Sequence, residues 1–229
     1  MYFGSSAIKY ACAMTTHEQQ HGTDPAIERH RQDAANYDRQ ALDYDWYGPQ
    51  ILFGLAYGQL APGGRVLDLG IGTGLSSQLF ARAGFSVTGV DGAAEMLAMC
   101  ESKGFAAELI QHDLKQLPLP LEDAGFELAI AAGLLQMFGE PQPLLAEMHR
   151  LLKPGGLAAL TTLPPVEDDV PDITCDSIEG INVYSYRDDY FGDLAAGLGF
   201  AVACRVTALM KSWQQPGELV PYRNWVLRR

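Results

Sequence analysis

The segment 65–83 places the strongest constraint on how this chain folds. A short apolar run, RVLDL (65–69), leads directly into the glycine-rich sequence GIGTG (70–74). The apolar run is typical of a strand buried on both faces of a parallel sheet, and apolar residues then recur at helical spacing from 75 to 83. Glycines allow a sharp turn between strand and helix and let a ligand approach the backbone without a Cβ in the way. The segment therefore predicts a strand-turn-helix unit with a ligand site at the carboxyl end of the strand.

The same alternation recurs along the chain, and this sets the fold class. Strands are expected at 65–69, 86–91, 107–111, 126–131 and 157–162, and helices at 75–83, 93–103 and 141–152. The sequence KPGG (153–156) is expected to end the last of these helices before strand 157–162 begins. Strands that alternate with helices imply right-handed crossovers and a mainly parallel α/β sheet.

The C-terminal third departs from this alternation. Residues 163–180 read as an acidic, proline-containing loop and residues 187–197 as a helix. Two closing strands, 201–209 and 222–228, are separated by a turn around 216–217, which predicts an antiparallel hairpin at one edge of the sheet.

The length of the chain favours a single domain. With 229 residues it can bury about two-thirds to three-quarters of its unfolded surface, but it is short for two α/β domains. We expect a flexible leader at 1–23 and a domain at 24–229. Within the domain, 24–60 forms a helical arm or lid of two helices that break at Gly48-Pro49, 61–162 forms the ligand-binding core, and 163–229 contributes a loop, a helix and the closing strands.

Composition narrows the partners. The formal net charge of −12 argues against nucleic acid, since that affinity comes mainly from Lys and Arg, although five basic residues against one Glu in 205–229 leave a local basic patch open. Cys12, Cys100, Cys175 and Cys204 show no metal-binding spacing, so we expect reduced thiols and no metal. No apolar run is long enough to span a membrane. These features predict a cytoplasmic protein, and both a monomer and a homodimer stay open.

Two carboxylates indicate the kind of ligand. Asp91 ends the second predicted strand, 21 residues after Gly70, where a carboxylate can accept both hydroxyls of a ribose. A dinucleotide fingerprint would need a third glycine at position 75, which is Leu75. Asp68 precedes the first glycine by two residues and suits an ammonium group, whereas it would repel a diphosphate. The pattern favours a nucleoside that carries an amino acid moiety.

Five motifs in this order resemble those of class I S-adenosylmethionine-dependent methyltransferases. They are VLDLGIGTG (66–74), VTGVD (87–91), QHDLKQLPLP (111–120), FELAIAAGLLQMF (126–138) and LLKPGG (151–156). The chain is most similar to the small-molecule group that includes quinone-biosynthesis enzymes. The resemblance implies a Rossmann-like, doubly wound, seven-stranded, mainly parallel sheet with a reversed edge strand, and a ligand over the switch point between the first and fourth strands. It also implies S-adenosyl-L-methionine as cofactor, S-adenosyl-L-homocysteine as product and a small-molecule acceptor.

The resemblance assigns cofactor contacts to matching positions. The methionine moiety would lie against Tyr37, Asp68 and the turn, and the ribose against Asp91. Gly92, Met96, Asp113 and Leu114 would surround the adenine, and the main chain at 131–133 would lie near the sulfonium. The residues assigned to the cofactor are therefore Tyr37, Asp68, Gly70, Gly72, Gly74, Asp91, Gly92, Met96, Asp113, Leu114 and Ala131.

No catalytic base is evident. Gln136 and Met137 stand where many relatives have one or two histidines, although in-line methyl transfer from a sulfonium relies largely on alignment. His112 and Tyr37 are the candidates for a catalytic role, and His149 is expected on a solvated helix face. The candidates for contact with the acceptor are Trp46, Gln136, Tyr184, Tyr186 and Arg187.

Three alternatives stay open at this point. The glycine turn alone fits a purely steric strand-to-helix connection. The missing histidine leaves room for a protein that binds S-adenosylmethionine without transferring a methyl group, and the scaffold also suits an NAD(P)-dependent oxidoreductase. Methyl transfer to oxygen, nitrogen or carbon of a small molecule is the function that the combined motifs favour.

Overall fold

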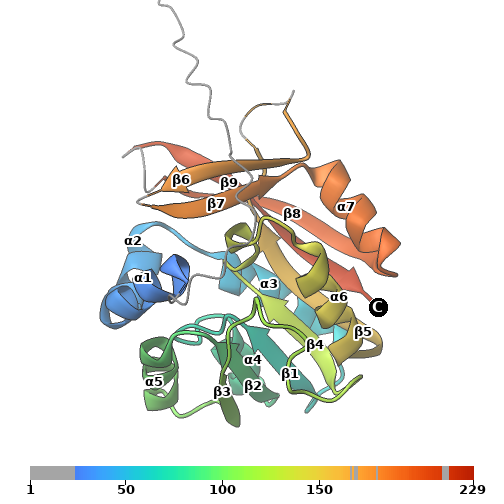
Figure 1. Ribbon diagram of the computed structural model, residues 1–229. Coiled ribbons are helices and arrows are strands. Elements are labelled where there is room, and N and C mark those ends of the chain that lie inside the picture. The colour runs from blue at the N-terminus through green and yellow to red at the C-terminus, as the bar shows by residue number, and fades with distance from the viewer. Residues whose placement is uncertain (1–23, 166, 168–169, 179, 213–216) are drawn as a thin grey trace, which may run out of the picture.

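The predicted first strand lies in the middle of a seven-stranded sheet. The computed structural model describes residues 24–165, 167, 170–178, 180–212 and 217–229, so the predicted leader lies outside the described residues. The strand order is β3-β2-β1-β4-β5-β9-β8 (Figure 1). The strands are β1 (Arg65–Leu69), β2 (Ser86–Asp91), β3 (Glu108–Gln111), β4 (Phe126–Ala131), β5 (Leu152–Thr162), β8 (Ala201–Lys211) and β9 (Leu219–Arg228).

Strand directions confirm the doubly wound, mainly parallel sheet. β1 pairs in parallel with both β2 and β4, so the strand order reverses between β1 and β4. The reversed strand is β9, which pairs antiparallel with β5 on one side and with β8 on the other. β8 and β9 thus form the predicted closing hairpin, and the carboxyl ends of β1, β2 and β4 meet at one edge of the sheet.

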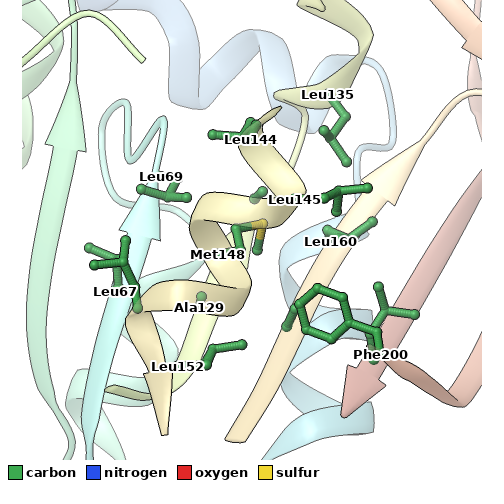
Figure 2. Close-up of a cluster of buried hydrophobic side chains, with 14 of the residues drawn as sticks. Leu67, Leu69, Ala129, Leu135, Leu144, Leu145, Met148, Leu152, Leu160 and Phe200 are labelled. Carbon is green, nitrogen blue, oxygen red and sulfur yellow. The ribbon is translucent and has the colours of Figure 1, made fainter. Parts of the chain in front are cut away.

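Helices cover both faces of the sheet. α4 (Ser77–Arg82), α5 (Ala94–Ser102) and α6 (Gln142–Leu151) follow β1, β2 and the segment after β4, and α7 (Asp188–Gly197) precedes β8. Leu144, Leu145 and Met148 of α6 are fully buried beside β1, β4 and β5 (Figure 2). Each such side chain contributes about 1.5–3 kcal/mol of burial free energy, which fixes the helix against the sheet.

Residues 24–60 contain three α-helices where two were predicted. α1 (Pro25–Asp33) and α2 (Tyr37–Asp43) are separated by a 3-10 turn, and α3 (Gly48–Ala56) follows. The break predicted at Gly48-Pro49 lies just before these residues, at 44–47 between α2 and α3, and Gly48-Pro49 begin α3. A proline in the first turn of a helix sacrifices no intrahelical hydrogen bond. Leu52 of α3 is fully buried, and α3 packs against β5 and β9.

Two further predictions are corrected. The expected loop at 163–180 contains β6 (Ile173–Ile178), which pairs antiparallel with β7 (Ile181–Tyr186) in a separate two-stranded sheet. Acidic and polar residues on β6 conceal its strand character in the sequence. β5 starts at Leu152 and not at 157, because Leu152 pairs with Phe126 and a register shift absorbs the KPGG sequence. Within the described part of the chain, no helix combines the length and apolarity that crossing a membrane requires.

Candidate active site

The glycine turn follows β1 and is fixed to β2. The backbone N–H groups of Gly70 and Ile71 both donate to the carbonyl oxygen of Val90, at 2.8 and 3.1 Å. Gly70, Gly72 and Gly74 all have positive φ, at 67°, 54° and 86°. Such backbone angles strain residues that carry a Cβ, so the turn requires glycine.

Gly72 and Gly74 differ in what surrounds them. A Cβ on Gly74 would lie 2.4 Å from the ring of Phe105, so this glycine serves the packing of the turn against the region after α5. A Cβ on Gly72 would meet nothing nearer than the carbonyl oxygen of Gly70 at 4.0 Å. Gly72 therefore opens onto free space, and together with Gly70 it lines a cavity, which we call the glycine-turn cavity.

Asp91, at the end of β2, is oriented by the backbone. Its Oδ2 accepts from the N–H of Gly72 and its Oδ1 from the N–H of Ala93, both at 2.8 Å. Burial raises the pKa of Asp91, while these hydrogen bonds oppose the shift. A carboxylate oxygen can accept more than one hydrogen bond, so both oxygens keep capacity for a pair of hydroxyls in the cavity.

Asp68 is a buried carboxylate with an unsatisfied oxygen. The residue is 2% exposed, and its Oδ2 has no hydrogen-bond partner among the described residues. Burial raises the pKa of Asp68 to about 7, and the charge of Asp91 adds to the increase while Ser77 opposes it. An isolated buried carboxylate is costly unless a cation or donor meets it. The ammonium of an amino acid moiety is such a group, so these residues fit S-adenosylmethionine.

The glycine-turn cavity has a volume of about 90 Å³. Eight of the predicted cofactor residues line it: Tyr37, Gly70, Gly72, Asp91, Gly92, Met96, Asp113 and Leu114. Three do not: Asp68 lies buried behind the turn, Gly74 packs on Phe105, and Ala131 is buried in β4, whereas its neighbours Ala132 and Gly133 line the cavity. The structure thus brings the carboxyl ends of β1, β2 and β4 together around one space.

The arm closes this space. Asp38 of α2 accepts from the hydroxyl of Thr73 at 2.5 Å and from Nζ of Lys103 at 2.6 Å, which ties α2 to the glycine turn and α5. The role of Asp38 was missed from the sequence, although it directly follows Tyr37, which was assigned to the cofactor. α1 is held differently, by the pairs Lys115–Asp24 and Arg31–Glu95, the latter at 2.9 Å.

We expect α1 to move when the cofactor binds. A cavity of about 90 Å³ is smaller than the roughly 300–1,000 Å³ of most small-molecule sites. Exposed ion pairs of the Arg31–Glu95 kind contribute only about 0–1 kcal/mol each. Hydrogen exchange should therefore be faster in α1 than in α2, and S-adenosylhomocysteine should slow it in α1. Exchange in α1 that is equal to that in α2, and insensitive to the ligand, would contradict this closure by the arm.

A second and larger cavity adjoins the first. It has a volume of about 650 Å³ and lies between the arm, the segment after β4, the end of β5 and the β6–β7 hairpin, and we call it the arm–hairpin cavity. In Figure 1, α1 and α2 lie between α5 and this hairpin. Apolar and aromatic lining comes from Tyr44, Trp46, Ile181, Val183, Met210 and Tyr222, and polar lining includes Gln40, Gln136, Thr161, Thr162 and Ser177.

Two predicted acceptor residues lie in the arm–hairpin cavity. The ring of Trp46 packs on that of Tyr222, with centroids 4.7 Å apart. Nε2 of Gln136 donates to the carbonyl oxygen of Gly133 at 2.8 Å, while the N–H of Gly133 donates to Oγ1 of Thr161 at 2.8 Å. These contacts fix the backbone that separates the two cavities.

The other acceptor candidates line neither cavity. Tyr186 is fully buried, and its hydroxyl contacts the carbonyl oxygens of Leu135 and Phe138, because it connects β7 to the segment after β4. Tyr184 packs against the core cluster, and Arg187 pairs with Asp189 next to it.

The two histidines weighed in the sequence also lie outside both cavities. Nε2 of His112 is hydrogen-bonded to the carbonyl oxygen of Gln116 at 2.7 Å. The ring of His149 packs edge-on against that of Phe200, with centroids 5.1 Å apart, so His149 does not lie on a fully solvated face as predicted. The sequence placed acceptor contacts on Tyr184 and Tyr186 of β7, but it missed the residues of β6 to β9 that line the cavity, since these carry no motif: Ser177, Ile178, Ile181, Val183, Met210 and Tyr222.

Comparisons with known proteins agree with this geometry. Residues 67–160 match a family model described as a methyltransferase domain. Malonyl-[acyl-carrier protein] O-methyltransferase of Serratia marcescens is 32% identical over 130 residues, which cover 57% of this chain and 49% of that protein. Demethylmenaquinone methyltransferase of Renibacterium salmoninarum is 38% identical over 95 residues, covering 42% of this chain and 39% of that protein. The chain thus spans half or less of the length of these relatives.

A solved structure resembles nearly the whole chain. Burkholderia thailandensis 1,6-didemethyltoxoflavin-N1-methyltransferase, with bound 1,6-didemethyltoxoflavin and S-adenosylhomocysteine, has a TM-score of 0.66 at 16% identity, covering 96% of this chain and 98% of that one. At this identity the likeness establishes the fold. Residues 67–160 of this chain thus match a methyltransferase-domain family, and the likeness to the solved structure shows that they adopt its Rossmann-like fold.

Proposed function

We propose that this protein transfers a methyl group from S-adenosylmethionine to a small molecule in the arm–hairpin cavity. The observation that carries the proposal is the meeting of two cavities at the β1/β4 switch point. One is surrounded by groups suited to the cofactor, and the other is large enough for a separate acceptor. His30, Tyr37, Gly133 and Met137 line both cavities, so the two ligands would touch there.

The residues around the glycine turn have separate roles in this proposal. Asp68, from behind the turn, attracts the ammonium directly or through water, Asp91 binds the ribose hydroxyls, and Gly72 leaves room for the ligand above the turn. Met96 packs beside the adenine, and Asp113 accepts from its amino group. Bound S-adenosylmethionine supplies a methyl group on a sulfonium, and the protein contributes alignment and exclusion of water.

The arm–hairpin cavity supports a small acceptor. Much of its lining is aromatic or aliphatic, as in most sites for small molecules. The net charge of −12 does not favour a polyanionic acceptor. Among the similar proteins, one is an O-methyltransferase and another an N1-methyltransferase. Similarity therefore does not identify the acceptor atom, which the residues lining this cavity would determine.

Replacing Asp91 with alanine is expected to weaken S-adenosylhomocysteine binding by about 1.5–3 kcal/mol, or roughly 10- to 150-fold. The alanine loses the ribose contacts and also leaves the N–H groups of Gly72 and Ala93 without their acceptor. Isothermal titration calorimetry would measure the change. Asp193→Ala on the exposed face of α7 is the matched control. A wild-type Kd in Asp91→Ala would contradict the ribose role.

Methyl transfer itself is tested with S-adenosylmethionine labelled in its methyl group. The protein and a small-molecule extract of cells should yield a labelled product, and Asp91→Ala should yield much less. Intact binding of S-adenosylhomocysteine with no labelled product would instead favour a protein that binds the cofactor without transferring the methyl. Binding of NADH, with none of S-adenosylhomocysteine, would favour the oxidoreductase alternative.

A further inference from the structure

The boundary between the two cavities contains one histidine. His30 of α1 is half-buried and lines both the glycine-turn cavity and the arm–hairpin cavity. Its ring lies edge-on to that of Tyr37, with centroids 6.0 Å apart. Because the donor would occupy one cavity and the acceptor the other, the methyl group would cross at this boundary. His30 therefore lies where a proton of the acceptor would have to leave.

The backbone of α1 selects the tautomer of His30. Nδ1 lies 2.8 Å from the carbonyl oxygen of Ala26, one turn earlier in the helix. A carbonyl oxygen can only accept, so Nδ1 must carry the hydrogen, and in the neutral ring Nε2 carries the lone pair. Among the described residues Nε2 has no hydrogen-bond partner, so it is available to accept a proton.

The other three residues at the boundary do not provide a base. Gly133 and Met137 carry no ionisable side chain. Burial, together with the charges of Asp91, Asp38 and Asp68, raises the pKa of Tyr37 to about 12. Tyr37 therefore keeps its proton near neutral pH and does not act as a base.

We propose that His30 is the general base of this methyl transfer and that the acceptor is a phenol- or enol-type hydroxyl; this rests on the function proposed above. The acceptor oxygen forms a bond to the methyl carbon, and its proton passes to Nε2 of His30. The carbon–sulfur bond breaks with its electron pair on sulfur, which leaves neutral S-adenosylhomocysteine, and His30 later releases the proton to water. The aromatic rings of Tyr44, Trp46 and Tyr222 in the arm–hairpin cavity suit a flat, conjugated acceptor of this kind.

Several charged or titratable groups lie near His30 and influence its protonation. Asp91 interacts with it electrostatically from the end of β2, and Tyr37 faces it from α2. On its own helix, Arg29 and Asp33 line the arm–hairpin cavity. Asp24, Lys115 and Asp113 line the glycine-turn cavity, and the Arg31–Glu95 pair connects α1 to α5. All of these stay the same when one ligand replaces another.

The test compares two ligands that differ in charge at sulfur. The full chain, labelled with ¹⁵N-histidine, is titrated by NMR with S-adenosylhomocysteine or S-adenosylmethionine bound, and His30→Gln assigns the signal. We expect the tautomer with hydrogen on Nδ1. We also expect the titration midpoint of His30 to be at least about half a pH unit lower with S-adenosylmethionine, since a cationic sulfonium nearby disfavours a second positive charge. His149, which lines neither cavity, is the internal control and should not differ.

Further measurements separate a base from a merely structural ring. The affinity of His30→Gln for S-adenosylhomocysteine should be within about threefold of wild type. A loss of affinity above tenfold would show that His30 binds the cofactor and would overturn the proposal. With the labelled product of the extract assay, His30→Gln should lose at least about 100-fold in kcat and recover as rising pH ionises the acceptor in solution. His149→Gln should match wild type.

Other results would contradict the role of His30, the hydroxyl acceptor or the proposed function separately. Equal His30 midpoints with the two ligands, or hydrogen on Nε2, would overturn the role of His30 while methyl transfer stands. A product methylated on a tertiary amine or a thioether would overturn the hydroxyl acceptor, because those groups lose no proton. Failure of wild-type protein to bind S-adenosylhomocysteine would instead contradict the proposed function itself.

Discussion

Asp68→Asn is expected to weaken S-adenosylhomocysteine binding by at least about 100-fold. Removing one partner of a buried charge pair costs about 2–5 kcal/mol, and the ammonium of the ligand would lose its only buried carboxylate on β1. Calorimetry at pH 8 would measure this loss. In wild-type protein the same affinity should decline as pH falls below about 7, because Asp68 then takes up a proton. In Asp68→Asn this pH dependence should be absent.

The same substitution should weaken ligand binding but favour the folded state of the ligand-free protein as pH rises. The pKa of Asp68 is raised from 3.8 to about 7 in the folded chain, so the folded state binds its proton more tightly than the unfolded state does. The stability that Asp68 contributes is therefore complete below about pH 4 and is lost as pH rises through about 7. The loss is worth up to about 4 kcal/mol.

Asparagine does not ionise, so the stability difference between Asp68→Asn and wild type should shift in favour of the variant between pH 4 and 7 and level off above. Urea unfolding at pH 5 and pH 8 would measure it. Unchanged affinity at pH 8 would contradict the ammonium role. A stability difference that is the same at both pH values would contradict the raised pKa.

Gly72→Val is expected to abolish detectable cofactor binding in a protein that still folds. A Cβ at this position meets no atom nearer than 4.0 Å in the ligand-free chain, so the branched side chain would occupy the space that the ligand needs. The φ of 54° also strains valine, at a cost on the order of 1–3 kcal/mol.

Gly84→Val separates the two effects. Gly84 has a φ of 91° with nothing within 4 Å of its Cβ position. It precedes the amino end of β2, whereas the candidate site lies at the carboxyl end of this strand. Both variants should lose similar stability in urea, but only Gly72→Val should lose binding of S-adenosylhomocysteine in calorimetry. Normal binding by folded Gly72→Val would mean that the ligand site is elsewhere.

The sequence predicted best the elements that are buried on both faces. The bounds of β1, β2 and β4 agree with the expectation residue for residue. The apolar runs of β1 and β2 end at a glycine and a carboxylate, and Gly133 follows shortly after β4. α3 and the β6–β7 hairpin were predicted poorly. α3 begins where Gly48-Pro49 reads as a break, and the strand character of β6 is masked by polar residues that tertiary packing accommodates.

The two halves of the candidate site differ for a similar reason. Asp68, Gly72 and Asp91 belong to motifs in which a short sequence separation fixes a spatial relation at adjacent strand ends. The arm–hairpin cavity draws on segments from Arg29 to Tyr222 that meet only through the three-dimensional packing of the arm and hairpin. Tyr186 illustrates the difficulty, because an aromatic residue near the predicted pocket is instead a buried connection between β7 and the segment after β4.

The central claim is that the glycine turn holds an S-adenosyl ligand through its amino acid and ribose groups. Calorimetric titration of the wild-type chain with S-adenosylhomocysteine, and separately with NADH, tests it most directly. We expect saturable one-to-one binding of S-adenosylhomocysteine and no binding of NADH. Binding of NADH without binding of S-adenosylhomocysteine would contradict it.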